Sequence, residues 1–107
     1  LSNISWLELP FVPENSIHAW QAFVARVIPS KKYKRNNIMD KLFKKGISTR
    51  PGTHAIHMLN YYKKKYKLLP NDFPVSKDCH NNTITLPLHN HLSKEDLQFI
   101  TNTIKNI

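Results

Sequence analysis

One short stretch, Arg50–His57 (RPGTHAIH), gathers more chemically capable side chains than any other part of the sequence. It holds an arginine, a threonine, two of the six histidines and one of the two glycines. Pro51 and Gly52 predict a loop with a constrained backbone, because proline fixes φ and glycine permits tight turns. An arginine on such a loop can bind a phosphate or a carboxylate through two parallel hydrogen bonds. The alternative is an arginine that donates to carbonyl groups of its own loop.

Histidines are metal ligands by type, but their spacing here does not favour a metal site. His54 and His57 lie three residues apart, which on a helix places both on one face. A zinc site needs three or four ligands, and the chain offers one cysteine, Cys79, and no second close pair of histidines at helical spacing. The sequence therefore predicts histidines that make structural hydrogen bonds, and no metal.

No familiar catalytic motif is present. The chain has no nucleophile elbow, no phosphate-binding glycine loop and no paired-carboxylate motif. Its formal net charge of +9 attracts anions of any kind, such as nucleic acid, an acidic membrane or a phosphorylated small molecule. The most general explanation of this charge is a solvated, lysine-rich surface.

Lysine clusters alternate with tyrosines at Tyr33, Tyr62 and Tyr66. Such a combination can bind single-stranded nucleic acid through phosphate contacts and base stacking. No motif of a known nucleic-acid-binding module accompanies it, and the tyrosines fall at helical positions typical of a core. Structural aromatic residues are therefore favoured over a binding face.

Length and composition fit one small domain. The 107 residues are 40% hydrophobic, which is enough for a modest core and too much for a disordered chain. No apolar run approaches the roughly 20 residues that span a bilayer, and the start of the sequence does not resemble a signal peptide. A single cysteine excludes an intrachain disulfide and fits a reducing compartment, so we expect a cytoplasmic location.

The elements that must position the loop follow from periodicity, proline and glycine. Leu1–Ser16 contains two prolines and no steady period, so we expect an extended lead-in or linker. Ile17–Ile28 mixes β-branched and aromatic residues on both faces, which predicts a strand covered on both sides. A helix is predicted from Arg35, with Gly46 after its basic last turn. Ile47–Thr49 is a short extended piece that leads into the loop.

The second half of the chain predicts three helices and a strand. His57–Tyr66 and Val75–Asn81 are expected as short helices, and Thr83–Leu88 alternates as a strand does. Ser93 and the acidic residue three positions later form a capping box at the start of a last helix, which ends near Asn106. The order of elements predicts a small α+β or α/β sandwich in which two or three strands are covered by helices.

Three stretches, in this order, resemble the C-terminal part of the DegT/StrS sugar aminotransferases: GISTRPGTHAIHMLNYYKKKY, residues 69–73, and ITLPLHNHLSKEDLQFI. HAWQAFVARV and RNNIMDKLFKKG upstream are also similar, so the resemblance covers residues 17–107. The RPGTHAIH form is similar to perosamine-synthase-like members. Each motif is modest, and the specificity lies in their order and spacing.

The resemblance implies an α+β fold with a small two- to three-stranded antiparallel sheet packed with helices, as in the C-terminal domain of fold-type I pyridoxal-phosphate aminotransferases. It implies that residues 1–16 are a lead-in and 17–107 the small domain. Family members transfer an amino group from glutamate to a nucleotide-linked keto sugar, using pyridoxal 5'-phosphate (PLP). The lysine that binds PLP lies on a large domain that nothing in this chain matches. We therefore expect the chain alone to bind no PLP and to be inactive.

The resemblance also implies partners and roles. The expected partners are the large domain and the nucleotide sugar, in an enzyme that is a homodimer at full length, with no membrane and no nucleic acid. The loop closes over the active site, so Arg50, Thr53, His54 and His57 are the expected substrate-binding residues, and no catalytic residue is expected. Asn90 departs from the family, which often has a proline there.

Two alternatives to the resemblance stay open. The chain could be a free-standing basic module that binds nucleic acid or an acidic partner. It could also be a degenerate partner protein that keeps the small-domain fold with no enzyme attached.

Overall fold

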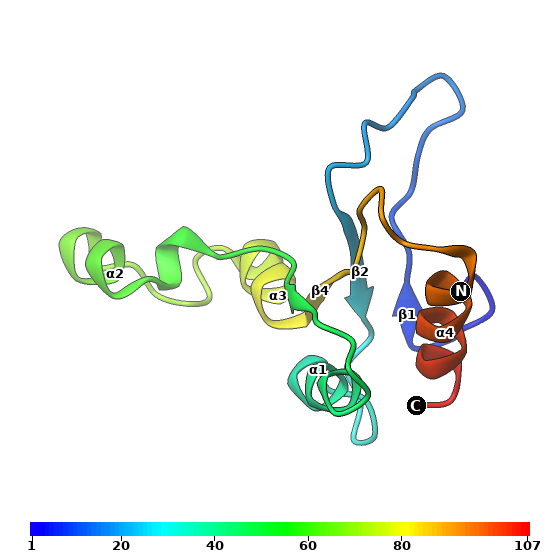
Figure 1. The fold of residues 1–107 in the computed structure, drawn as a ribbon. Helices are drawn as coiled ribbons and strands as arrows, with labels where there is room; N and C mark the ends of the chain where they lie inside the picture. Colours follow the sequence, from blue (N-terminus) through cyan, green and yellow to red (C-terminus); the bar gives the residue numbers. More distant parts are fainter.

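A computed structural model describes all residues, 1–107, and its centre is a four-stranded antiparallel sheet (Figure 1). The strand order is β1 (Leu7–Glu8), β2 (Phe23–Val27), β4 (Thr83–Leu86) and β3 (Arg50–Pro51). Every neighbouring pair runs antiparallel. The α+β class and the antiparallel sheet are therefore confirmed, but the sheet has four strands where two or three were expected.

The extra strands were missed for a physical reason. β1 and β3 have two residues each, too few to show an alternation of apolar and polar side chains. β3 is built from Arg50 and Pro51, directly after the extended piece expected at Ile47–Thr49. β1 lies inside the expected lead-in, 1–16, so this segment contributes a strand to the sheet.

One face of the sheet packs against α1 (Arg35–Phe43) and α4 (Lys94–Lys105). The core is a single cluster of eleven buried residues: Trp6, Leu7, Ala25, Val27, Ile38, Leu42, Ile47, Ile84, Leu86, Ile100 and Ile104. Trp6 also stacks on Tyr33, with 4.9 Å between ring centroids. Because two core residues come from the first nine positions, the start of the chain belongs to this domain's core.

The other face of the central strands meets α3 (Pro74–Asn82). Arg26 on β2 donates from Nε to Asp78 on α3 at 2.7 Å and from Nη1 to Glu8 on β1 at 3.0 Å. β2 is thus covered on both faces, as expected. It starts at Phe23 instead of Ile17, because Trp20 adopts a left-handed φ of 48° that interrupts the extended backbone.

The helix ends follow the sequence signals. Gly46 takes a φ of 78° after α1, and the N–H of Ile47 donates back to the carbonyl of Leu42 at 3.0 Å. The capping box at α4 is confirmed: the N–H of Asp96 donates to Ser93 Oγ, and the N–H of Ser93 donates to the carboxylate of Asp96. These bonds hold the pKa of the Asp96 carboxyl below its ordinary value.

Residues 56–73 form an arm that projects from the sheet (Figure 1). The single helix expected at His57–Tyr66 is instead a 3₁₀ turn, η1 (Ile56–Met58), and a short helix, α2 (Asn60–Tyr66), separated by Leu59 in an extended conformation. α2 has no buried residue. No helix of the chain is long and apolar enough to span a bilayer.

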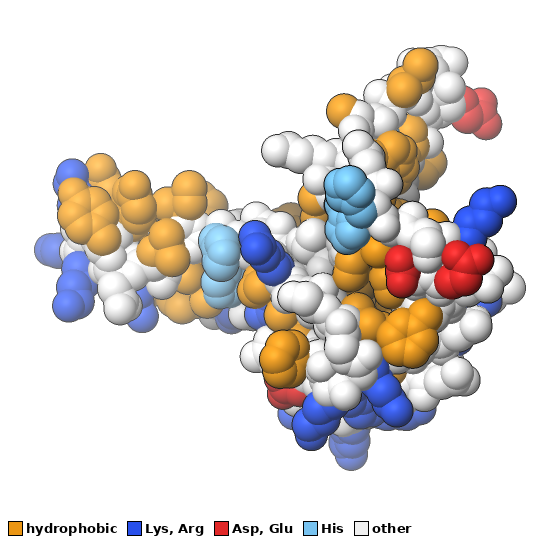
Figure 2. All heavy atoms as spheres, in the orientation of Figure 1, with side chains coloured by type: hydrophobic (Ala, Val, Ile, Leu, Met, Phe, Trp, Pro, Cys, Tyr) orange, Lys and Arg blue, Asp and Glu red, His pale blue; other side chains and the backbone are white.

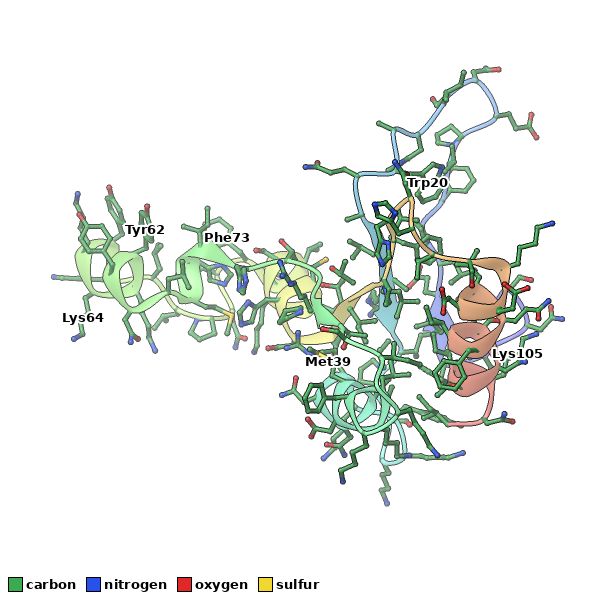
Figure 3. All side chains as sticks on the ribbon, viewed as in Figure 1. Trp20, Met39, Tyr62, Lys64, Phe73 and Lys105 are labelled. Carbon is green, nitrogen blue, oxygen red and sulfur yellow. The ribbon has the colours of Figure 1, made fainter.

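The expectation that the α2 tyrosines are core residues is wrong. Tyr61, Tyr62 and Tyr66 are exposed, and they contact one another along the arm. Figure 2 shows hydrophobic atoms spread over the surface of the arm, and Figure 3 shows Tyr62 pointing away from the sheet. An apolar stripe predicts that a helix face needs a cover, but here no element of the chain supplies one.

Candidate functional site

The first half of the Arg50–His57 loop is anchored at Gly52. Its N–H donates to the carbonyl of Thr83 at 3.0 Å. A Cβ at Gly52 would lie 2.6 Å from both Thr83 Oγ1 and Val24 Cγ1, so only glycine fits this close approach. The Thr83 hydroxyl is itself fixed, because it donates to the carbonyl of Cys79 at 2.6 Å.

The second half of the loop is anchored at Ala55, whose exposed fraction is 1%. Its N–H donates to Nδ1 of His80 on α3 at 3.1 Å. A neutral imidazole that accepts at Nδ1 carries its proton on Nε2. The rings of His80 and His54 lie near each other, with 5.9 Å between centroids. Thr53 and His54, between the two anchors, are exposed.

His57 occupies a different environment from the other predicted site residues. Its exposed fraction is 6%, its Nε2 lies 3.3 Å from the carbonyl oxygen of Pro70, and its ring packs on Phe73. It therefore ties η1 to the C-terminal end of the arm, next to α3. The burial of His57 fits a residue that holds the loop in position. Direct contact of His57 with a substrate stays a prediction.

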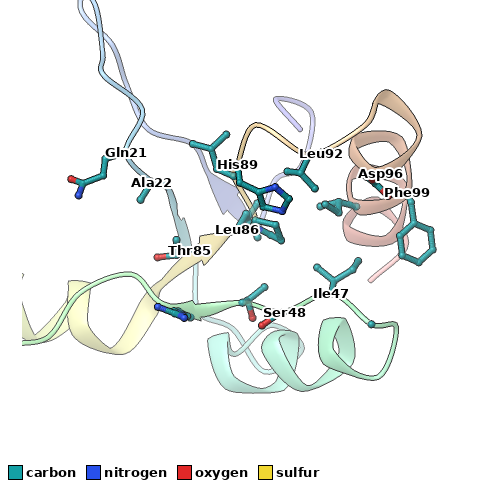
Figure 4. Close-up of a pocket in the computed structure, with 16 residues that line it drawn as sticks. Gln21, Ala22, Ile47, Ser48, Thr85, Leu86, His89, Leu92, Asp96 and Phe99 are labelled. Atoms are coloured by element: carbon teal, nitrogen blue, oxygen red, sulfur yellow. The ribbon is translucent and has the colours of Figure 1, made fainter.

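Arg50 lines a cavity of about 700 Å³ that lies between the β3–β4 edge of the sheet and α4 (Figure 4). The polar side chains around it are those of Gln21, Ser48, Thr49, Arg50, Thr85, His89 and Asp96. Leu86, Leu92 and Phe99 are among its apolar lining. Thr53, His54 and His57 do not line this cavity, so the four predicted residues do not share one pocket.

The guanidinium of Arg50 is unpaired. The side-chain hydrogen bonds and ion pairs made by arginines in this structure belong to Arg26 and Arg35. The alternative role for Arg50, donation to carbonyls of its own loop, is therefore not realised. An exposed and unpaired guanidinium beside hydroxyl-bearing residues can bind a phosphate or a carboxylate.

The residues present do not fit PLP. Covalent attachment of PLP needs a lysine held in a closed site. Every lysine here is exposed except Lys77, which is half-buried and donates to Asn71 Oδ1 at 2.8 Å. Nor do three or more histidine, cysteine or acidic side chains come together anywhere as metal ligands. What the loop and the cavity offer is recognition of an anionic or hydroxyl-rich ligand.

Sequence reasoning missed His80. It lies far from the loop in the sequence, on a helix whose pattern gives no sign of a contact with Ala55. Only the antiparallel pairing of β3 with β4 brings the end of α3 beside the loop. No spacing rule reveals that contact.

Comparison with known proteins gives consistent matches over nearly the whole chain. The sequence profile of the DegT/DnrJ/EryC1/StrS aminotransferase family matches residues 1–105. The spore coat polysaccharide biosynthesis protein SpsC of Bacillus subtilis is 27% identical over 106 residues, which are 97% of this chain and 27% of that protein.

Solved structures agree with these matches. The candidate sugar aminotransferase Spr1654 of Streptococcus pneumoniae is 25% identical and superposes with a TM-score of 0.80, over 95% of this chain and 26% of that one. It has also been solved in PLP and PMP forms. The aminotransferase TlmJ of Streptoalloteichus hindustanus shares the fold, with a TM-score of 0.81 and 20% identity over 99% of this chain and 27% of its own. This chain spans about a quarter of the length of these relatives.

Proposed function

This chain belongs to the DegT/DnrJ/EryC1/StrS aminotransferase family, and we propose that it is the C-terminal small domain of a PLP-dependent enzyme that transfers an amino group from glutamate to a nucleotide-linked keto sugar. Two of the similar proteins carry names that point to sugar chemistry, one in polysaccharide biosynthesis and one as a sugar aminotransferase. Because the chain spans only about a quarter of those proteins, the remainder of the enzyme has to supply the cofactor site.

The observation that carries the proposal is the anchored loop. Gly52 and Ala55 hold it on the sheet and on α3, so Thr53 and His54 are presented at a fixed place. Arg50, just before the first anchor, is unpaired and lines the neighbouring cavity. Figure 2 shows histidine and basic side chains side by side where the arm meets the sheet. Such groups suit a sugar with a diphosphate, since both ligand parts are rich in hydrogen-bond acceptors.

Exposed apolar side chains support the proposal that the rest of the enzyme covers part of this domain. Phe11 and Ile17 are exposed on the segment before β2, and Tyr66, Leu69 and Val75 are exposed on or near the arm. Tyr61, Tyr62 and Tyr66 contact one another on the arm, and a contiguous exposed apolar patch typically marks an interaction site. The arm and the segment before β2 are therefore the expected contact surfaces for the rest of the enzyme.

The division of roles follows from the residues. PLP, bound elsewhere in the enzyme, supplies the electron sink for amino transfer. This chain's own residues would bind and orient the sugar nucleotide: Arg50 through its guanidinium, Thr53 and His54 through hydrogen bonds. His57 would hold the loop from below through its contact with the Pro70 carbonyl.

The test is Arg50→Ala in an enzyme that contains this domain together with its cofactor domain. We expect KM for the nucleotide sugar to rise about tenfold or more, since a charge-assisted contact is lost, while the absorbance of bound PLP stays the same. Lys105→Ala, an exposed basic residue on α4, is the matched control and should change neither quantity. Loss of PLP absorbance in Arg50→Ala would contradict a substrate-side role.

A second candidate function is a basic module that binds single-stranded nucleic acid. The favouring observation is on the arm, where Lys65 Nζ lies 5.4 Å from the ring centroids of both Tyr61 and Tyr66. Exposed aromatic rings among lysines are the chemistry of base stacking and phosphate contact. Oligonucleotide binding that weakens steeply with salt would support this function. The absence of binding at low salt would eliminate it.

A further inference from the structure

The loop Arg50–His57 is held by a residue that no motif points to. His80 accepts the backbone N–H of Ala55 at Nδ1, and Ala55 is almost fully buried. A buried N–H without an acceptor is costly. We propose that His80 is a positioning residue, which fixes Thr53 and His54 for substrate by holding the loop through Ala55.

The position of the two loop anchors explains why one hydrogen bond can fix Thr53 and His54. Gly52 binds the carbonyl of Thr83, the first residue of β4, and Ala55 binds His80, on the last turn of α3 just before β4. The hydrogen-bond acceptors for Gly52 and Ala55 therefore both lie at the junction of α3 and β4. Only two residues lie between them, so losing either anchor frees the segment that faces outward. His80 also places its ring beside that of His54, which limits where the His54 side chain can go.

The chemistry of the acceptor makes the role specific. Nδ1 accepts only while it carries no proton, so the neutral ring with its proton on Nε2 is the competent form. An asparagine at position 80 places a carbonyl oxygen close to where Nδ1 lies. A glutamine places its oxygen one atom further out, near the position of Nε2. Comparing the two variants therefore distinguishes the need for an acceptor at the position of Nδ1 from the need for any polar side chain.

The first test is residue-resolved amide hydrogen exchange on the 107-residue chain, compared among His80→Ala, His80→Asn and His80→Gln. His80→Ala should speed exchange at Ala55 by at least about tenfold, the effect of losing one buried hydrogen bond. His80→Asn should restore slow exchange, and His80→Gln should restore it less. Exchange at Ile84 in the core should be unchanged in all three. Ser76→Ala, at an exposed position of the same helix, is the matched control.

Two results would overturn the proposal: unchanged exchange at Ala55 in His80→Ala, or no rescue by His80→Asn in a variant whose core is intact. If His80→Ala does not fold, His80→Leu keeps the bulk of the ring without the acceptor, and the same comparison applies.

The second test separates this inference from the proposed function, on which the role toward substrate rests. In the enzyme with its cofactor domain, His80→Ala should raise KM for the nucleotide sugar several-fold, with His80→Asn close to the original value. Faster exchange at Ala55 with unchanged KM would support the anchoring by His80 and contradict a substrate-facing loop. Unchanged exchange would reject the role of His80, whatever the enzyme does.

Discussion

Gly52 lies against Thr83 so closely that a Cβ added to the glycine would be 2.6 Å from the threonine hydroxyl oxygen. The contact joins the loop to the first residue of β4, and Val24 lies equally close on β2. Because three strands meet at this point, there is little freedom for any partner to move away. The loop's position relative to the sheet therefore depends on the absence of a side chain at one residue.

Gly52→Ala is expected to lower the free energy of unfolding by about 1–3 kcal/mol, the usual cost of forcing an extra methyl group into a packed site. The added methyl group meets Thr83 Oγ1 and Val24 Cγ1. Urea denaturation measures the change. In a Val24→Ala background the same glycine substitution should cost less, because the clash with Val24 is gone while those with Thr83 remain. An unaltered midpoint in Gly52→Ala would show that the loop accepts a side chain there.

Gly46 offers the opposite case, in which backbone conformation matters and space does not. Its φ is 78°, and a Cβ there would meet nothing within 4 Å. Gly46→Ala should cost about 1–2 kcal/mol, because the left-handed region is unfavourable for alanine. Gly46→Asn should cost less, since asparagine tolerates that conformation. Equal losses for the two variants in thermal or urea unfolding would argue against a conformational cause.

The Arg26–Asp78 ion pair predicts a specific dependence of stability on pH. The hydrogen bond from Arg26 holds the pKa of the Asp78 carboxyl below its ordinary value, and a hydrogen bond from Asn82 adds to this effect. A lowered pKa in the folded state means that the stabilisation is full above the unfolded value of about 3.9 and is lost as pH falls through the folded value.

Asp78→Asn should therefore lower the free energy of unfolding at pH 7 by about 1 kcal/mol or less, because the pair is partly exposed. The difference from the unmodified chain should shrink as pH falls below about 4. Urea denaturation at pH 7, 5 and 3 measures it. Glu8→Gln, which removes the more exposed partner of Arg26, should have a smaller effect. A difference between Asp78→Asn and the unmodified chain that is constant over this pH range would contradict the linkage.

The sequence predicted the elements that carry a clear local signal. α1 and α4 were located from apolar spacing, a glycine stop and the Ser93 capping box, and β4 from alternation that begins at Thr83. These signals are local, because each depends on residues within a few positions of one another. The candidate loop was found in the same way, from Pro51 and Gly52.

The features that were missed depend on the rest of the fold. β1 and β3 are strands only because β2 and β4 lie beside them. The Ala55–His80 contact and the burial of His57 arise from the packing of α3 and the arm. Apolar spacing in α2 predicted buried tyrosines, but it does not reveal that no element of this chain covers them.

The first nine residues should be needed for folding, since they supply β1 and two core side chains. Trp6→Ala removes a buried ring that stacks on Tyr33, and it should lower the free energy of unfolding by about 3–5 kcal/mol. Deletion of residues 1–9 should leave a chain without a cooperative unfolding transition. Phe11→Ala, at an exposed position just after this segment, is the control and should change little. A stable, cooperatively folding deletion variant would support a separate linker at the start of the chain.

The arm should behave differently in the isolated chain and in the enzyme. α2 has no buried residue here, so the double variant Tyr62→Ser, Tyr66→Ser should change the free energy of unfolding of the 107-residue chain by no more than about 0.5 kcal/mol. Leu42→Ala, in the core, should cost about 2–5 kcal/mol and shows that the measurement is sensitive. In an enzyme that includes the cofactor domain, the same tyrosine variants should lower the thermal midpoint and expose the arm to proteolysis, because a covered apolar face loses its contacts. If the tyrosine variants leave the whole enzyme as stable and as protected as before, the arm is not a contact surface for the rest of the enzyme.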